Sequence, residues 1–187
     1  MGFLSQNELK RLEFLELGEN VLISDKVSIY NAKNIKIGSN VRIDDFCILS
    51  ASEQGIQIGN HVHIACYVSL IGKAQIKLED YVGVSSKTAI YSSSDDYSGN
   101  YMTNPTISDE FKKVDNRPVL LKKFSILGAG CIVLPGVCIG EGTAIGALSL
   151  VTKNIPDWGI YSGSPLRFVK NRKKEMLRFL EKIEKGF

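Results

Sequence analysis

The sequence predicts an all-β solenoid, a coil of short strands, because hydrophobic positions recur every six residues. The clearest stretch is 121–156, which divides into LKKFSI, LGAGCI, VLPGVC, IGEGTA, IGALSL and VTKNIP. An aliphatic residue opens every block, and the fifth places hold Ser125, Cys131, Val137, Thr143, Ser149 and Ile155. A period of six is neither helical nor simply that of a strand. It fits a coil that turns a corner every six residues and points one aliphatic side chain inward each time.

The same phase extends towards the N-terminus and predicts triangular coils. Three hexads make one coil, and complete sets begin at Ile37, Ile58 and Leu78, after a weaker set that begins at Ile23. Short insertions between the sets, such as 52–55, are expected at corners. The length suits one domain, residues 1–187, with the β-helix over 21–156.

A polar segment at 91–118 breaks the period once on a large scale. It contains two prolines, and the hexads resume in phase at Leu121. Loops of this length inside a compact domain are usually functional or disordered. We therefore expect a loop that leaves one corner and returns to it, and favour a functional role because the solenoid itself offers no concave pocket. The other interpretation is that its tyrosines and aspartates are ordinary solvated loop residues.

The N-terminal segment is predicted to be a short helix. Residues 3–17 place leucines among charged residues, with Ser5 or Asn7 as the N-cap and Gly18 as the stop. We expect this helix to form a cap, over 1–20, that docks on the first coil.

The C-terminal tail, 157–187, is predicted to contain an amphipathic helix over 169–185, because apolar residues recur there at helical spacing. Between 165 and 187 there are eight Lys or Arg and three Asp or Glu, a local net charge of +5 in a chain of net charge +3. A solvated helix face, nucleic-acid binding and contacts to cofactor phosphates all fit such a run.

Composition and cysteine placement indicate an ordinary soluble chain. Charged residues make up 23% and hydrophobic residues 44%. No signal-peptide pattern or membrane span is evident, so a cytoplasmic location is expected. Cys47 and Cys131 occupy fifth places and are interpreted as core residues; Cys66 and Cys138 fall elsewhere, and no pair has metal-ligand spacing. Structural roles are expected for all four.

The run LGAGCIVLPGVCIGEGTAIGALSLVTKNIPDWGIYSGSPLRFV resembles the C-terminal signature of hexapeptide-repeat acyltransferases. It is most similar to galactoside and maltose O-acetyltransferases and to bacterial polysaccharide acetyltransferases, through the motifs LPGV, IGA-x-S, VTK-x-IP and G-x-P-x-R. The resemblance implies a left-handed parallel β-helix, a hand that the period alone does not give. It also implies a homotrimer with acetyl-coenzyme A sites between neighbouring subunits.

Carried over position by position, the resemblance implies a coenzyme A site. Ala129 and Ala147 match the small residues beside the pantetheine arm in relatives. Towards the phosphate and adenine end, the matching residues are Thr152, Lys153, Arg167 and Lys170. Basic side chains suit the several phosphate charges of coenzyme A. For Thr152 and Lys153, a solvated final corner is the alternative.

The catalytic base departs from the family pattern. Similar O-acetyltransferases carry a histidine at the sixth place of the third hexad in the loop-bearing coil. Here that hexad is IYSSSD, so the matching residue is Asp95, followed by Asp96 and Tyr97, which are candidates for acceptor contacts. An exposed aspartate, with a pKa of about 3.9, is a weak base for a hydroxyl. Desolvation or the neighbouring carboxylate would raise that pKa; alternatively, the acceptor is an amine, which needs less help.

The two histidines, His61 and His63, share the hexad IGNHVH. His63 and Ala65 should project from one face of an extended strand, in a neighbourhood that contacts the acceptor in relatives. His63 is thus a second candidate for the acid/base residue, whereas His61 is interpreted as an exposed turn residue. Carbonic anhydrases of this fold bind zinc through three histidines, so no metal is expected here.

Together these features predict an acetyl-coenzyme A-dependent acetyltransferase. The expected acceptor is a hydroxyl or amine of a nucleotide- or lipid-linked sugar of surface-polysaccharide biosynthesis, attacked directly in a ternary complex. A non-catalytic β-helix scaffold is the alternative. VTK and G-x-P-x-R favour the enzyme, and the absent histidine favours the scaffold. Neither a nucleic-acid partner nor a membrane span is expected, and fold alone does not identify the sugar.

Overall fold

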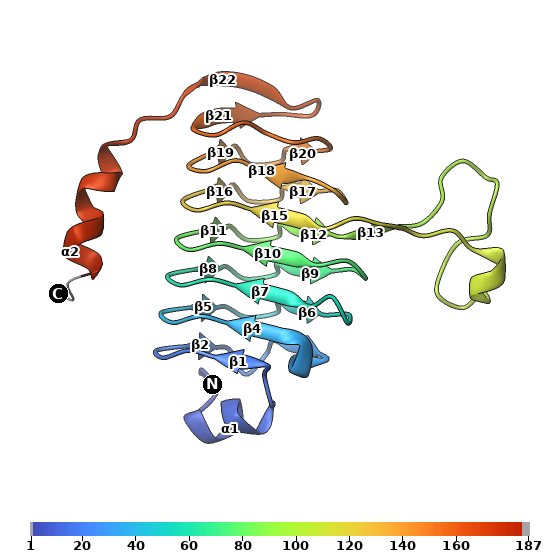
Figure 1. Cartoon of the computed structure of the whole chain (residues 1–187), viewed down its shortest axis with the longest axis horizontal. Helices are drawn as coiled ribbons and strands as arrows, with labels where there is room; N and C mark the ends of the chain where they lie inside the picture. Colours follow the sequence, from blue (N-terminus) through green and yellow to red (C-terminus); the bar gives the residue numbers. More distant parts are fainter. Residues whose placement is uncertain (1, 185–187) are drawn as a thin grey trace.

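The chain forms the expected left-handed parallel β-helix, and the computed structural model describes residues 2–184 (Figure 1). Three sheets make the sides of a triangular prism. The first sheet contains β1 (Glu16–Leu17), β4 (Ile35–Ile37), β7 (Ile56–Ile58), β10 (Ile76–Leu78), β15 (Val119–Leu121) and β18 (Cys138–Ile139). The second contains β2 (Leu22–Ile23), β5 (Arg42–Ile43), β8 (His63–Ile64), β11 (Gly83–Val84), β16 (Ile126–Leu127), β19 (Ala144–Ile145), β21 (Gly159–Ser162) and β22 (Arg167–Asn171). The third contains β3 (Ser28–Tyr30), β6 (Ile48–Ser50), β9 (Ser69–Ile71), β12 (Ala89–Tyr91), β17 (Ile132–Val133) and β20 (Leu150–Val151).

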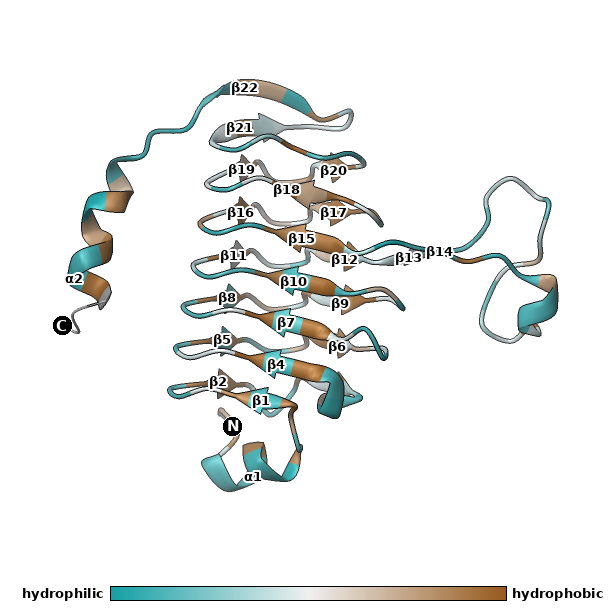
Figure 2. Ribbon diagram, viewed as in Figure 1, coloured by the Kyte–Doolittle hydropathy of each residue, from teal (hydrophilic) through white to brown (hydrophobic). Residues whose placement is uncertain are grey.

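The core consists of aliphatic ladders, one rung per coil. In the second sheet, Ile43 pairs with Ile64 and Ile64 with Val84, and all three are buried. Each such side chain contributes about 1.5–3 kcal/mol by leaving water. The fifth places are buried as well, which confirms that Cys47 and Cys131 fill the core. Figure 2 shows hydrophobic colouring concentrated on the strands and hydrophilic colouring over much of the long loop.

Three corners join the sheets. The first corner connects the first sheet to the second, the second corner the second to the third, and the third corner the third to the first. At the first and second corners most coils place one residue in the left-handed conformation, for example His61 and Tyr81 at the first and Tyr67 at the second. This conformation is costly for residues with a side chain. It is stabilised here by hydrogen bonds between coils, such as that from the Tyr81 amide to the Asn60 carbonyl at 2.8 Å.

The predicted long loop leaves the third corner after β12 and returns to it before β15 (Figure 1). Its base is a two-residue antiparallel stem of β13 (Ser93–Ser94) and β14 (Asp115–Asn116), which the sequence pattern did not predict. A short 3-10 helix, η2 (Asp109–Phe111), lies within it. Another, η1 (Ala32–Asn34), lies at the third corner of the first coil. We call residues 92–118 the excursion loop.

The N-terminal helix is shorter than predicted. Helix α1 (Gln6–Arg11) begins with a capping box between Ser5 and Glu8, which confirms Ser5 as the N-cap. The prediction that the helix ends at Gly18 was wrong, because β1 already pairs with β4. Gly18 serves a different purpose: a Cβ there would lie 2.5 Å from the carbonyl carbon of Gly38, so the glycine permits close approach of the first two coils.

The C-terminal helix is also shorter than predicted. Val169 lies in β22, which pairs antiparallel with β21, and not in a helix. The chain then forms η3 (Glu175–Phe179) and α2 (Leu180–Glu184). The last residue of the predicted helix, 185, lies outside the described residues. Arg172 anchors the segment after β22, because its Nη1 donates to the carbonyls of Phe124 and Gly142 at 2.8 and 3.0 Å.

Candidate active site

A cleft opens where the excursion loop meets the third corners of the coils below it. Its volume is about 760 Å³. We call it the third-corner cleft. Its lining residues are Asn31, Ser50, Ala51, Ser52, Ile71, Gly72, Lys73, Ser93, Asp95, Asn104, Pro105, Asp109, Lys112 and Val114. The volume lies in the range of small-molecule and cofactor sites.

Hydrogen bonds between coils fix the floor of this cleft. The Lys73 amide donates to Ser93 Oγ at 2.5 Å, and Ser93 Oγ donates to Asn116 Oδ1 at 2.8 Å. Ser92 Oγ donates to the Ala74 carbonyl at 2.6 Å. A Cβ at Gly72 would lie 2.2 Å from Ser92 Oγ, so only glycine lets the stem of the loop pack here. The base of the excursion loop is therefore fixed relative to the coil beneath it.

Asp95 is the predicted catalytic residue that lines the cleft. It follows β13 directly, it is exposed, and its Oδ2 accepts a hydrogen bond from the Asn104 amide at 3.3 Å. This bond joins Asp95 to a second residue of the excursion loop that lines the same cleft. A carboxylate in this setting can bind a cation or accept a proton.

Asp96 and Tyr97 do not line the cleft. The Asp96 carboxylate accepts hydrogen bonds from Ser98 Oγ at 2.8 Å and from the Gly99 and Asn100 amides at 3.0 and 3.2 Å. The Ser98 hydroxyl first, and then the loop amides, hold the pKa of Asp96 below its ordinary value. Tyr97 is 93% exposed. Asp96 therefore organises the turn of the excursion loop.

His63 lies on the outer face of the second sheet, away from the cleft. Its Nε2 is 2.8 Å from Asp44 Oδ2, and Arg42 Nε donates to Asp44 Oδ1 at 2.7 Å. Burial pushes the pKa of Asp44 upward, but the hydrogen bonds from His63 and Arg42 outweigh it, so the net pKa is lowered. Ala65 follows at the second corner, where its carbonyl accepts from the Cys47 thiol at 3.0 Å. The structure thus brings His63 and Asp44 together but does not bring either to Asp95 in one chain's cleft.

Two of the predicted coenzyme A residues are neighbours at the second corner. The Leu148 amide donates to the Ala129 carbonyl at 2.8 Å, and both Ala129 and Ala147 are exposed. Between them Gly128 has no space for a side chain, because a Cβ would lie 2.5 Å from the Ala147 amide nitrogen. At these two positions the corner therefore presents backbone and methyl groups, beside the exposed side chain of Leu148.

The other predicted coenzyme A residues lie at separate places. Arg167 pairs with Ser162 beside the second corner, whereas Lys170 pairs with Ile160 towards the first. Thr152 and Lys153 follow β20, at the third corner, and are exposed. Thr152 comes five positions after Ala147, so the chain between them spans at most about 17 Å. The six residues lie at the second corner, in β22 and at the third corner.

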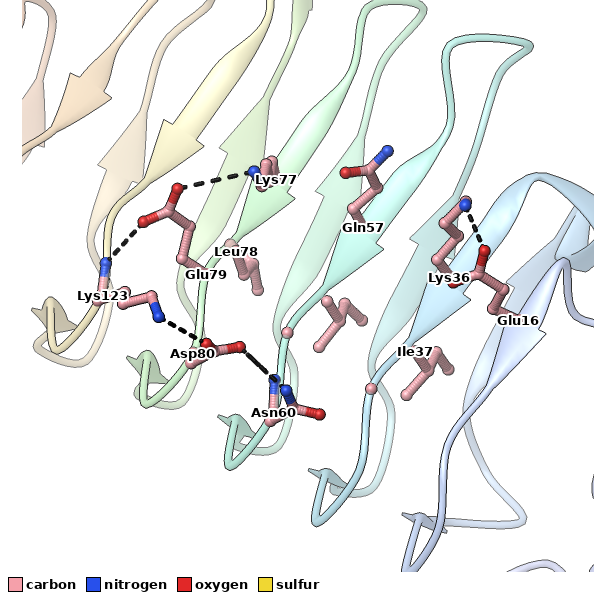
Figure 3. Close-up of a pocket in the computed structure, with 13 residues that line it drawn as sticks. Glu16, Lys36, Ile37, Gln57, Asn60, Lys77, Leu78, Glu79, Asp80 and Lys123 are labelled. Carbon is pink, nitrogen blue, oxygen red and sulfur yellow. Dashed lines mark hydrogen bonds and ion pairs between the residues drawn. The ribbon is translucent and has the colours of Figure 1, made fainter. Parts of the chain in front are cut away.

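The groove on the outer face of the first sheet is a weaker candidate. Figure 3 shows its charged side chains already paired with one another. Lys36 pairs with Glu16, Lys77 Nζ is 3.6 Å from Glu79, and Lys123 Nζ is 3.0 Å from Asp80. Among residues 2–184, no group of three or more His, Cys, Asp or Glu is placed to hold a metal ion. No helix in that range has the length and apolar character needed to cross a membrane.

Sequence reasoning missed the basic residues of the cleft. Lys73 lies at a corner, as the fourth residue of the hexad 70–75, a place that no motif marks, and Lys112 lies in the loop outside the repeat. The interaction of Asp44 with both Arg42 and His63 was missed as well. A hexad pattern places Arg42 and His63 at equivalent outward positions, and that signal was available.

No protein-family model matches the sequence. The chain is 46% identical over 185 residues to the dTDP-4-amino-4,6-dideoxy-D-glucose acyltransferase of Escherichia coli, covering 99% of this chain and 96% of that one. It is 32% identical to a galactoside O-acetyltransferase of Lactococcus lactis, over 86% of this chain and 64% of that one.

Comparison with solved structures gives the same result as comparison with these relatives. AntD, an N-acyltransferase from Bacillus cereus, superimposes with a TM-score of 0.94 at 46% identity, over 100% of this chain and 98% of that one. That structure is a variant in complex with dTDP-4-amino-4,6-dideoxyglucose and coenzyme A. A maltose O-acetyltransferase from Clostridium difficile shares the fold at a TM-score of 0.59 and 21% identity.

Relatives of this kind bind coenzyme A or an acyl-coenzyme A, in agreement with the expected acyl donor. They also favour the enzyme over the scaffold alternative, since the match extends over nearly the whole of both chains. This chain belongs to the hexapeptide-repeat acyltransferase family and is a sugar acyltransferase.

Proposed function

We propose that this enzyme transfers an acyl group from a coenzyme A thioester to the amine of a nucleotide-linked amino sugar of the 4-amino-4,6-dideoxy type. One observation carries the proposal. At the place where similar O-acetyltransferases have a histidine, this chain has Asp95, and Asp95 lines the third-corner cleft. The names of the E. coli and B. cereus relatives support the amine and the nucleotide.

An aspartate suits an amine better than a hydroxyl. A sugar amine near neutral pH is largely protonated, and a carboxylate both binds the ammonium group and accepts a proton from it. The neutral amine then attacks the thioester carbonyl carbon, the carbon–sulfur bond breaks, and the thiolate leaves. The second amine proton passes to the thiolate or to solvent. Asp95 would return its own proton to solvent before the next turnover.

His63 remains the second candidate for the acid/base role. Asp44 holds its Nε2, so in the neutral ring Nδ1 is the nitrogen with a free lone pair. His63 and Asp95 lie on different sides of the prism, so a single chain does not present both to one substrate. A neighbouring copy would have to supply one of them.

We infer a homotrimer with sites between subunits. Exposed apolar side chains gather at and beside the second corner: Phe46, Tyr67, Ile126, Ile132 and Leu148. Monomeric proteins rarely expose large apolar patches, so these side chains favour a covered edge. The second-corner alanines and the third-corner cleft lie on different edges of the prism and meet only if another copy supplies one of the two. Sedimentation should give three copies; a fully active monomer would contradict this inference.

The coenzyme A site is proposed along those edges. The small side chains of Ala129 and Ala147 suit the pantetheine arm, and the exposed Lys153, Arg167 and Lys170 suit the phosphates. Thr152 supplies a hydroxyl next to Lys153. Both proposed substrates carry phosphate charges that do not cross membranes unaided, which supports a cytoplasmic location.

The test is a thiol-release assay with acetyl-coenzyme A and a panel of dTDP-linked amino sugars, each matched by the sugar with a hydroxyl in place of the amine. Wild type should acylate the amine, giving an amide that mass spectrometry identifies. Asp95→Asn should reduce kcat by about 10²–10⁴-fold if Asp95 is the base. Asp115→Asn, an aspartate of the same loop that pairs with Arg117 outside the cleft, is the matched control.

The outcomes separate the alternatives. Activity lost in His63→Ala but kept in Asp95→Asn would transfer the acid/base role to His63. Acylation of the hydroxyl analogues alone would refute the amine acceptor. An absence of turnover with every acceptor, together with no binding of coenzyme A, would refute the enzyme and favour the non-catalytic scaffold.

A further inference from the structure

The third-corner cleft carries more charge than binding of an amine requires. Asp95 alone would hold an ammonium group. The cleft is also lined by Lys73, from the corner after β9, and by Asp109 and Lys112, from the excursion loop. Because the cleft presents two ammonium groups beside its two carboxylates, it favours a ligand that carries negative charge as well as the positive charge of an amine.

Lys112 is the more notable of the two lysines. Its side chain is only 9% exposed, and its Nζ lies 2.9 Å from Asp109 Oδ1, a carboxylate that is itself 81% exposed. An ammonium group has three donors. Asp109 occupies one of them, and residues 2–184 supply no second ion-pair partner. A lysine with a mostly buried side chain and donors to spare, at the wall of a cleft, is arranged to meet an anion from outside the chain.

Lys73 stands beside the same carboxylate. Lys112 first, and Lys73 after it, lower the pKa of Asp109, so both ammonium groups lie within electrostatic reach of one point. The Lys73 backbone is held from two sides, by Ser93 at its amide and by the Ser52 hydroxyl at its carbonyl. Its ammonium forms no ion pair with any described residue. The corner therefore fixes the backbone of Lys73 and leaves its ammonium group available to a ligand.

We propose that Lys73 and Lys112 bind the diphosphate of the nucleotide-sugar acceptor. This inference rests on the proposed function and adds to it the residues that recognise the nucleotide part. The cleft would then match a zwitterion, with the sugar ammonium beside Asp95 and the diphosphate beside the lysines. Asp109 orients Lys112 and does not touch the ligand. A volume of about 760 Å³ accommodates a ligand of this size.

Coenzyme A also contains a diphosphate, so the same two lysines could in principle serve the donor. Position favours the acceptor, because Asp95 and the lysines line one cleft, whereas the alanines proposed for the pantetheine arm lie at the second corner. The experiment must therefore vary the two substrates separately.

Steady-state kinetics of Lys73→Met and Lys112→Met provide the test. Each variant should raise the KM for the nucleotide sugar about tenfold or more, since charge-assisted hydrogen bonds to phosphate are lost. The kcat should change little, because the diphosphate is bound alike before and during acyl transfer. The KM for the acyl-coenzyme A should stay at the wild-type value.

Three controls separate recognition from a structural effect. The same amino sugar without its nucleotide should react equally fast with wild type and both variants. Lys112→Arg keeps the charge and should recover most of the affinity. Lys77→Met removes a lysine that pairs with Glu79 on the outer face of the first sheet, and should leave both KM values unchanged (Figure 3).

Binding of dTDP, measured by calorimetry, tests the site without turnover. Weaker dTDP binding in both variants supports the diphosphate site even if no acceptor is acylated and the proposed function fails. Unchanged dTDP binding overturns it. A raised KM for acyl-coenzyme A in place of the acceptor would also overturn it, as would an equal loss with the sugar that lacks a nucleotide.

Discussion

The first and third corners arise from the same hexad repeat, but they are built in opposite ways. At the first corner, successive coils stack aromatic rings, with centroids 4.8 Å apart between His61 and Tyr81 and 5.1 Å apart between Tyr81 and Phe124. Trp158 continues the series, and Lys174 Nζ lies 4.8 Å from the centroid of its ring. At the third corner the coils differ in length, one of them extends into the excursion loop, and a cleft results.

The two corners differ in what their side chains contact. At the first corner, side chains of successive coils contact one another, as the rings of His61, Tyr81 and Phe124 do. An irregular corner interrupts those contacts and leaves polar groups such as Lys73 and Asp95 facing a cavity. Binding residues commonly sit on loops held by a rigid scaffold, and here the scaffold is the stack of regular corners. If this division is correct, changes at the third corner should affect activity and changes at the first should affect stability.

The largest effect should come from removing the excursion loop. Residues 92–118 can be replaced by Gly-Lys-Ala-Gln, the four residues that form the third corner of the preceding coil at 72–75. We expect turnover to fall at least about 10³-fold, because Asp95 and Lys112 are lost. The melting temperature should change by no more than a few degrees, since the core ladders stay intact. Calorimetry measures the melting temperature and the thiol-release assay measures turnover. Residual activity above a tenth of wild type would show that the loop is not part of the active site.

The sequence predicts the regular part of this molecule well. The six-residue spacing arises because one side chain per hexad enters the core. Leu121, Leu127 and Val133, which open the three hexads of one coil, are fully buried as expected. At the two ends of the chain the predicted helices were too long, and for the C-terminal helix the reason is physical. Residues 169–171 were part of the predicted helix 169–185, because Val169 fits its apolar spacing. However, β21, the last strand of the prism, would otherwise present unpaired backbone groups, and β22 satisfies them.

Only some of the residues that line the third-corner cleft could be predicted from the sequence. Asp95 was found because it occupies a place in a hexad, where a family pattern can be compared. Lys73 and Lys112 are 39 residues apart by their numbers and come together only through the folded loop, so no local pattern links them. The positions of the second-corner alanines and of Arg167 followed from motifs, whereas their distance from the cleft depends on assembly, which no motif encodes.

A second prediction concerns the aromatic stack at the first corner. Phe124 has a φ of 61°, and its ring lies between those of Tyr81 and Trp158. Phe124→Ala should lower the free energy of unfolding by about 2 kcal/mol, through lost stacking and burial. Phe124→Gly loses the same contacts but relieves the left-handed backbone, so it should be no less stable than the alanine variant. Urea unfolding compares them, and kcat should remain at the wild-type value in both.

A third prediction uses the ion pair at the same corner. Asp80 accepts from the Asn60 amide at 2.8 Å and pairs with Lys123 at 3.0 Å. Burial raises the pKa of Asp80, but these partners outweigh it and the net pKa lies below the ordinary 3.8. A lowered folded pKa stabilises the protein above the unfolded value, and this contribution is lost as the pH falls through the folded one.

Asp80→Asn should therefore cost about 0.5–1 kcal/mol at pH 7, with solvent screening keeping the figure small. The difference from wild type should shrink as the pH is lowered below 4, because protonation then removes the same interactions from wild type. Urea unfolding at both pH values measures this. A difference independent of pH would mean that the carboxylate charge plays no part in holding the corner.

The smallest effect is expected at Ser125, where the first corner carries an imperfection. Its Oγ is buried and has no hydrogen-bond partner, whereas Thr143, the equivalent residue of the next coil, donates to the Pro156 carbonyl at 2.7 Å. Replacing an unsatisfied buried hydroxyl removes a desolvation cost, so Ser125→Ala should be neutral or stabilising by up to about 1 kcal/mol. Thr143→Val, which removes a satisfied hydroxyl at nearly constant volume, should instead destabilise by about 1 kcal/mol. Opposite signs in urea unfolding would show that even the regular corner is held by specific contacts in each coil and not by the repeat alone.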